Sequence, residues 1–145
     1  MTYESLTRLG WLAGMIDGEG TVAISRQVNV AGYRRGISMR AFVQIAGTDR
    51  RMIDRAKEIL EEVSGHRAYI HAVKRSNENH KLGWAVGTYS NSAMLALLTI
   101  LRPHLVGKAE QADVVTSFSR RHLVIGRRRS DETFQLDEID YAKCR

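Results

Sequence analysis

Residues 11–20 read Trp-Leu-Ala-Gly-Met-Ile-Asp-Gly-Glu-Gly, and this stretch decides the fold of the chain. On a helix of about 3.6 residues per turn, Gly10, Ala13, Gly14, Asp17 and Gly18 share one stripe, and large aliphatic side chains fill the neighbouring stripe. Side chains hold ordinary helices roughly 8–10 Å apart, so a stripe of small residues suits a closer approach by a second helix. Each glycine weakens the helix by roughly 0.5–1 kcal/mol relative to alanine, and we expect a packed partner to compensate.

The helix is expected to end at Gly18 and Gly20, with Glu19 between the two glycines. The helix dipole disfavours a carboxylate at this end, and a bound divalent cation would remove the penalty. Glu19 is therefore a candidate metal ligand, and the Gly18 carbonyl is a second one because no side chain blocks the approach to it. For Asp17 we favour a bond to backbone over a bond to metal.

Residues 12–20 resemble the motif that names the LAGLIDADG homing endonucleases, with Glu19 at the eighth, acidic position. The resemblance covers roughly residues 6–122. It implies an α+β fold with an αββαββα core, whose four-stranded antiparallel sheet forms a DNA-binding saddle. In that family the motif helices of two subunits or two half-domains pack together. A chain with a single motif is thus expected to form a homodimer through this helix, with Gly10, Ala13, Gly14 and Asp17 in the dimer interface.

Composition places the chain among soluble proteins that can bind nucleic acid. It has 145 residues and a net charge of +6, with 22 Lys and Arg against 16 Asp and Glu. The single cysteine, Cys144, excludes an intrachain disulfide, and no apolar run is long enough to span a membrane. We expect an intracellular protein with one core domain at 1–122 and a charged C-terminal extension at 123–145, either solvated or docked as a short helix. The compartment, whether cytoplasm, nucleoid or organelle matrix, stays undetermined.

Periodicity predicts the remaining elements. Strands are expected at 22–30 and 37–45 around a glycine-containing loop, and at 67–75 and 82–89 in a less regular second hairpin. Helices are expected from a cap at Thr48 or Asp49 to 65, from a cap at Asn91 or Ser92 to 101, and at 108–122. The pattern leaves open which face of the sheet Trp84 and Val86 occupy.

The resemblance adds two catalytic candidates, and at one position this sequence differs from the family pattern. Lys108 corresponds to a lysine that the family directs at its active site, and Arg51 is placed to orient water or phosphate. Relatives often carry a polar residue at the end of the second strand, where this chain has Gly47. Solvent, Gln44 or Asp49 would have to substitute for it, so weak or absent cleavage is a live alternative.

Polar residues on the strands are the candidates for DNA contact. Paired hydrogen bonds from Arg or Gln to base edges each contribute roughly 1–3 kcal/mol of discrimination. Candidates for base contacts are Ser25, Gln27, Asn29, Ser38, Arg40 and Gln44, with Tyr69, His71 and Arg75 from the second hairpin; candidates for phosphate contacts are Arg34, Arg35 and Lys74. Tyr69 and His71 have packing within the sheet as an equal alternative.

The leading hypothesis is a homodimeric, Mg²⁺-dependent endonuclease that cuts a long, near-palindromic double-stranded DNA site and leaves short 3′ overhangs. Mn²⁺ or Ca²⁺ can occupy the same sites as Mg²⁺. The second hypothesis is a protein with the same fold that does not cut DNA, either an intron RNA maturase or a DNA-binding regulator. A third, in which residues 77–80 are the remnant of another nuclease motif, is discounted because no second metal-binding histidine stands at useful spacing.

Overall fold

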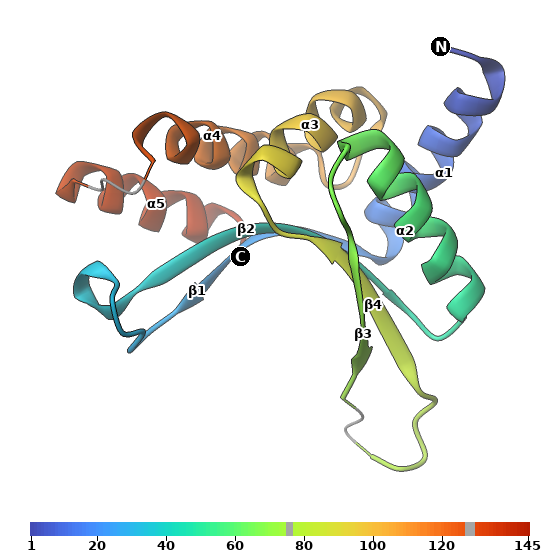
Figure 1. Cartoon of the computed structure of the whole chain (residues 1–145), viewed down its shortest axis with the longest axis horizontal. Helices are drawn as coiled ribbons and strands as arrows, with labels where there is room; N and C mark the ends of the chain where they lie inside the picture. The colour runs from blue at the N-terminus through green and yellow to red at the C-terminus, as the bar shows by residue number, and fades with distance from the viewer. Residues whose placement is uncertain (75–76, 127–129) are drawn as a thin grey trace.

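A computed structural model describes residues 1–74, 77–126 and 130–145 of the chain (Figure 1). Its helices are α1 (Tyr3–Glu19), α2 (Arg50–Ser64), α3 (Asn91–Leu101), α4 (Ala109–Ile125) and α5 (Asp131–Lys143). Its strands are β1 (Gly20–Gln27), β2 (Ser38–Gly47), β3 (Tyr69–Val73) and β4 (Gly83–Thr88). Two short 3-10 turns, Arg34–Gly36 and Arg102–His104, lie between them. The order from α1 to α3 confirms the αββαββα core, and the predicted further helix, α4, and then α5 follow it.

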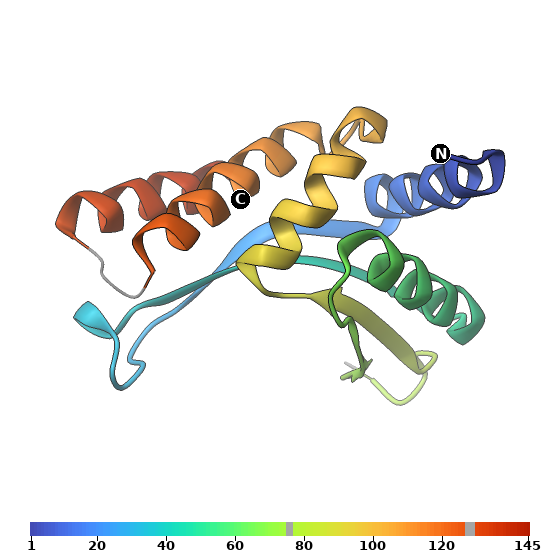
Figure 2. The same ribbon diagram turned by 45° about the horizontal axis from the view of Figure 1, so that its top comes forward.

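The four strands form one antiparallel sheet in the order β1-β2-β4-β3. All five helices lie on one face of this sheet, and the opposite face is an uncovered arch (Figures 1 and 2). None of the helices in the described ranges has the length and apolar character needed to cross a membrane. This two-layer arrangement confirms the α+β class and the saddle shape that the resemblance implies.

The core lies between the sheet and the helices. The aliphatic stripe of α1, Leu9, Leu12 and Ile16, is at most 3% exposed, so the amphipathic pattern of the opening helix is confirmed. Alternate strand residues face the same core, and helices α2, α3 and α4 contribute their inner faces to it. The largest fully buried side chains include Val22, Ile45, Ile53, Ile59, Leu60, Met94, Leu97, Leu98, Leu101 and Phe118.

The sheet register settles the orientation of Trp84 and Val86. Val86 pairs with the buried Ile45, and Trp84 pairs with Gly47, two residues further along the same face of β2. Directly opposed residues share a face, so both side chains lie on the helix-covered side. Trp84 there packs under Arg50 of α2, whose guanidinium lies 5.6 Å from the ring centroid.

The first strand ends three residues earlier than its pattern predicts. Asn29 has a φ of 60°, in the left-handed region that a strand cannot contain and that asparagine tolerates better than most residues. The N–H of Val30 then bonds to the Gly36 carbonyl, which closes the hairpin loop. Asn29 is consequently an exposed loop residue, and the prediction that placed it on the reading face of the strand is wrong.

Helix caps agree with the sequence in one case and differ in another. The Asp49 side chain accepts a hydrogen bond from the Arg51 N–H, which confirms one of the two predicted caps for α2. The cap of α3 is Ser90 rather than Asn91 or Ser92, because its hydroxyl accepts from the Ala93 N–H at 3.0 Å.

The C-terminal extension is a docked helix. Phe134, Tyr141 and Cys144 pack against the core, and α5 contacts both α4 and β1. The arginine run at 127–129 that precedes it lies outside the described residues. Of the two interpretations of the tail, the structure supports the docked element.

Candidate active site and nucleic-acid face

Asp17, in the last turn of α1, ties the motif helix to the segment that precedes α4. Its Oδ2 accepts a hydrogen bond from the Val106 N–H at 2.8 Å, and its Oδ1 accepts one from the Lys108 N–H at 2.9 Å. The carboxylate thereby caps the N-terminus of α4, where Lys108 has no side-chain cap of its own. The predicted contact of Asp17 with backbone is observed, and the donors are N–H groups of the segment that leads into α4.

Glu19 is the last residue of α1, and its side chain is exposed. Within the described residues it has no hydrogen-bond or ion-pair partner, so its carboxylate is available to a ligand. The last helical bond runs from the Gly20 N–H to the Ile16 carbonyl. The Gly18 carbonyl is therefore among those that the helix itself leaves without a donor.

One chain offers few ligands for a metal ion. The described residues contain no group of three or more His, Cys, Asp or Glu side chains placed to hold one. Mg²⁺ in phosphoryl-transfer sites usually takes one or two carboxylates, with water and substrate oxygens in the remaining positions. The exposed Glu19 carboxylate and the Gly18 carbonyl are the oxygen groups at this helix end that could supply ligands to such an ion.

Lys108 lies beside the end of the motif helix. Its backbone N–H is bonded to Asp17, two residues before Glu19, and its own side chain is half-buried. The structure therefore brings Lys108 and the α1 end together, although 91 residues separate Asp17 from Lys108 in the chain. The Lys108 backbone thus lies against the last turn of the helix that ends at Glu19.

Arg51 is held by Asp49. Its Nε and Nη2 donate to the two carboxylate oxygens of Asp49 at 3.0 and 2.8 Å, while the Arg51 side chain stays 91% exposed. The hydrogen bonds from Arg51 lower the pKa of Asp49 to about 2, so this carboxyl is ionised at neutral pH. Gly20, at the start of β1, pairs with Ile45, near the end of β2. The end of β2 and the residues that follow it therefore lie at the same end of the strands as the C-terminus of α1.

The small-residue stripe of α1 is open to solvent in the single chain. Gly10, Gly14 and Gly18 are exposed, and an added Cβ at any of them would meet no atom within 4 Å. Tyr3 and Leu6 extend this face with exposed fractions of 88% and 46%. Ala13 departs from the predicted set, because it is 2% exposed and packs inside its own chain. The open stripe therefore consists of glycines, with Asp17 engaged at its edge.

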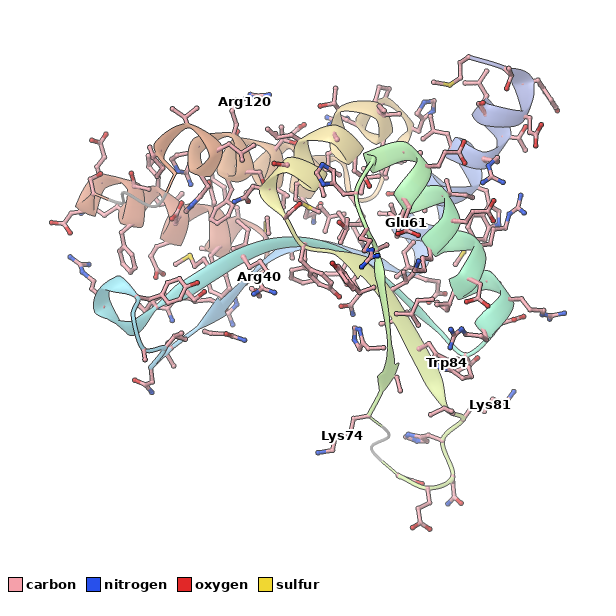
Figure 3. All side chains as sticks on the ribbon, viewed as in Figure 1. Arg40, Glu61, Lys74, Lys81, Trp84 and Arg120 are labelled. Carbon is pink, nitrogen blue, oxygen red and sulfur yellow. The ribbon has the colours of Figure 1, made fainter. Side chains whose placement is uncertain are left out.

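The uncovered face of the sheet carries most of the predicted DNA contacts. Ser25 pairs with Arg40, Gln27 with Ser38, and Tyr69 with Gly87, which itself opposes Gln44. Because opposed residues share a face, these side chains form one surface with His71, on the side opposite the core. Tyr69 and His71 thus lie on the open face, and Figure 3 shows Arg40 beneath the arch.

The remaining candidates have different surroundings. Lys74 is exposed on the β3–β4 hairpin (Figure 3), whereas Arg75 lies outside the described residues and Arg34 is placed only by its backbone, in the β1–β2 loop. Arg35 forms an ion pair with Asp131 of α5 at 3.2 Å, which competes with its predicted phosphate contact. The contacts of all these residues with DNA stay predictions.

Tyr89 and Lys81 lie near the predicted contacts but are not among the candidates from the sequence. Tyr89 bends over Gly87, where an added Cβ would come within 2.8 Å of the tyrosine hydroxyl, and its ring lies 6.5 Å from that of Tyr69. Lys81 joins Lys74 around a hollow of about 390 Å³ beside Gly47. The glycine two residues before the tyrosine was the available signal for the first, and the positive charge of Lys81 beside the second hairpin was the signal for the other.

The first prediction concerns Asp17. Replacing it with alanine removes two carboxylate bonds to backbone N–H groups, and we expect the free energy of unfolding to fall by about 2 kcal/mol, as charged hydrogen bonds of this kind suggest. Urea denaturation measures this loss. Asp54→Ala is the control, because it removes only the exposed pair with Arg50 one turn away. Equal stability of the two variants would contradict the tethering role.

Comparisons with known proteins bear on the fold. No protein-family profile and no curated protein match this sequence. The homing endonuclease I-CvuI in complex with its target matches with a TM-score of 0.78 and 15% identity, over 99% of this chain and 83% of that one. The archaeal intron-encoded homing endonuclease I-Vdi141I complexed with DNA matches with a TM-score of 0.75 and 16% identity, over 97% and 83%.

A third structure differs in length. The LAGLIDADG homing endonuclease I-SmaMI bound to cleaved DNA matches with a TM-score of 0.68 and 13% identity, over 94% of this chain but 43% of that one. At such identities the likeness concerns the backbone arrangement, and it agrees with the motif of residues 12–20. The chain therefore has the fold of the LAGLIDADG homing endonucleases.

Proposed function

We propose that this chain is a site-specific double-strand DNA endonuclease that acts as a homodimer with Mg²⁺. The observation that carries the proposal is the pair of hydrogen bonds that the Val106 and Lys108 N–H groups donate to Asp17, two residues before the exposed Glu19. The matching structures I-CvuI, I-Vdi141I and I-SmaMI are homing endonucleases bound to DNA, and the first was also studied with Mg and Ca.

The chemistry follows from these residues. Bound Mg²⁺ would activate water and neutralise charge on the phosphate. Glu19 and the Gly18 carbonyl would hold it. The Lys108 ammonium would stabilise the negative charge that develops on the attacked phosphate, and Arg51 would orient phosphate or water. Each of these groups lies at or near the α1 end, or in the segments that the register and the Asp17 bonds bring to it.

A dimer completes the site. One chain supplies one Glu19, whereas cutting two strands calls for two carboxylates. The open glycine stripe of α1 gives a self-complementary surface for a two-fold axis. This chain also matches 43% of the length of I-SmaMI, as expected if one chain corresponds to half of a larger enzyme. A two-fold dimer would favour a near-palindromic DNA site, because each half reads one half-site.

Cleavage of a randomised double-stranded target library by the purified protein tests the proposal. The expected result is cutting at one near-palindromic site, dependent on Mg²⁺ or Mn²⁺ and leaving short 3′ overhangs. Sedimentation of the protein alone should give the mass of two chains. Selective retention of sequences without any cutting would instead support the DNA-binding regulator, and selective binding of intron RNA would support the maturase.

Gly47 gives a prediction of increased activity. An added Cβ there would meet only the Cδ1 of Ile53, at an ordinary 3.7 Å, and Gly47 is exposed, so a longer side chain can extend into solvent. We expect Gly47→Gln to raise the cleavage rate about tenfold, because a polar group at the end of β2 would help to orient water. Single-turnover kinetics measures the rate, with Gly47→Leu as a control of similar size. An equal effect of both variants would contradict a polar role.

A further inference from the structure

The outer part of the β1–β2 ribbon has little support within the sheet. β4 pairs with β2 only over Val43–Gly47. The five rungs from Ala23↔Phe42 to Gln27↔Ser38 join β1 and β2 alone, and we call residues 23–27 and 38–42 the outer ribbon. An isolated two-stranded ribbon is marginally stable at best. Its support must therefore come from the helix-covered face.

The C-terminal helix α5 supplies ion pairs to this ribbon. Arg26 lies on the covered face, where its Nε donates to Glu138 Oε1 at 2.9 Å, and its guanidinium lies 6.0 Å from the ring centroid of Tyr141. The Arg26 and Glu138 side chains are 29% and 34% exposed, so the pair is partly shielded from water. Arg26 is the charged residue that interrupts the apolar alternation of β1, and α5 explains its presence there.

A second pair holds the loop at the end of the ribbon. Arg35 bonds to Asp131 at 3.2 Å, and its guanidinium lies 4.8 Å from the centroid of the Phe134 ring. Both pairs run from the basic ribbon to the acidic helix, at positions seven residues apart on α5. Seven residues are about two helical turns, so the two acidic groups project from the same side of α5.

α5 is itself anchored to α4 through a buried charged cluster. Asp137, 2% exposed, bonds to Arg121 at 2.6 Å and to His122 at 2.9 Å, and Asp140 bonds to Arg121 at 2.8 Å. Burial opposes ionisation of Asp137, but the hydrogen bonds from His122 and Arg121 outweigh it and lower its pKa. A helix fixed to α4 in this way gives the ribbon a rigid support.

We propose that α5 is a positioning element, in which Glu138 and Asp131 fix the outer ribbon at the angle required for its open-face side chains to read bases. This inference rests on the proposed DNA-binding function. The open face of the outer ribbon carries Ser25, Gln27, Ser38 and Arg40. Paired hydrogen bonds to bases depend on orientation, so a freer ribbon loses discrimination at the base pairs that it covers. Gln44, on the part of β2 that pairs with both β1 and β4, keeps its position.

The test uses a full-length double variant that carries both Asp131→Asn and Glu138→Gln. This variant is compared with the wild-type protein. Hydrogen exchange at residues 23–27 and 38–42 reports the support of the ribbon directly, and we expect exchange there to rise at least about tenfold while residues 43–47 and 84–88 stay unchanged. Glu132→Gln is the matched control, because Glu132 is exposed on α5 and has no ion-pair partner in the described part of the chain. Unchanged exchange of the outer ribbon would overturn the proposal.

Base preference reports the consequence for DNA. Selection from a randomised target library should show discrimination at the outer base pairs of each half-site reduced about tenfold in the double variant, with the inner positions unchanged. Exchanging one pair, by Arg26→Glu with Glu138→Arg in otherwise wild-type protein, should retain the outer preference, whereas Arg26→Glu alone should lose it. A uniform loss across the site, or no rescue, overturns the positioning role. A wild-type protein without any sequence preference would instead refute the proposed function.

Discussion

Glu19→Gln is expected to reduce DNA cleavage by about 10³-fold and to leave DNA binding intact. Glu19 is the one exposed carboxylate at the end of α1 that is free of partners in the described structure, and the substitution removes it from both subunits of the proposed homodimer. Glutamine keeps the size and the amide oxygen but lacks the negative charge that holds a divalent cation. Loss of that charge removes the activation of water and the charge neutralisation that the metal would supply.

The direction of the change in DNA affinity distinguishes a metal-binding role of Glu19 from a structural role. A carboxylate near DNA phosphates repels them, so without divalent metal Glu19→Gln should bind target DNA as tightly as wild type or more tightly. Gel-shift titration with EDTA and single-turnover cleavage with Mg²⁺ measure the two quantities on the same target. Glu4→Gln, in the first turn of the same helix, is the control of equal charge change. Cleavage at the wild-type rate would remove Glu19 from the proposed site.

Local patterns in the sequence were sufficient to predict the core elements. The aliphatic stripe of α1 and the alternation of β2, with Met39, Ala41, Val43 and Ile45 buried, both arise from periodicities that residues within one element determine. Asn29 shows the limit of such patterns. Its neighbours Val28 and Val30 continue the strand alternation, yet the backbone turns there, because hairpin closure to Gly36 outweighs the local propensity.

Contacts between distant segments were not predictable in the same way. Nothing near Asp17 indicates that its carboxylate bonds to backbone N–H groups 89 and 91 residues later. Arg26 likewise stands among apolar residues of its strand without a local partner, because Glu138 lies 112 residues later, in the tail that the resemblance does not cover. The candidate site was found through the resemblance of residues 12–20, and the structure supplied the bonds that assemble it.

Gly14→Leu is expected to abolish the dimer while leaving the single chain as stable as before or more stable. An added Cβ at Gly14 meets nothing within 4 Å in the chain, and leucine is a better helix former than glycine by up to about 0.8 kcal/mol. In a two-fold dimer, however, the new side chain would stand between two closely packed α1 helices, on both sides of the axis. Monomer stability and assembly should thus move in opposite directions, which a general folding defect cannot produce.

Sedimentation equilibrium and thermal unfolding at low protein concentration measure these two effects separately. We expect Gly14→Leu to sediment as one chain, to unfold at or above the temperature of the wild-type monomer, and to lose double-strand cleavage at least about 100-fold, because Glu19 of a second chain is no longer present. Gly14→Ala should weaken the dimer less, in proportion to its size. Ser117→Leu, exposed on α4, controls for added surface hydrophobicity. A dimeric, active Gly14→Leu protein would show that the glycine stripe is not the interface, and the second Glu19 would then have to reach the site through another surface.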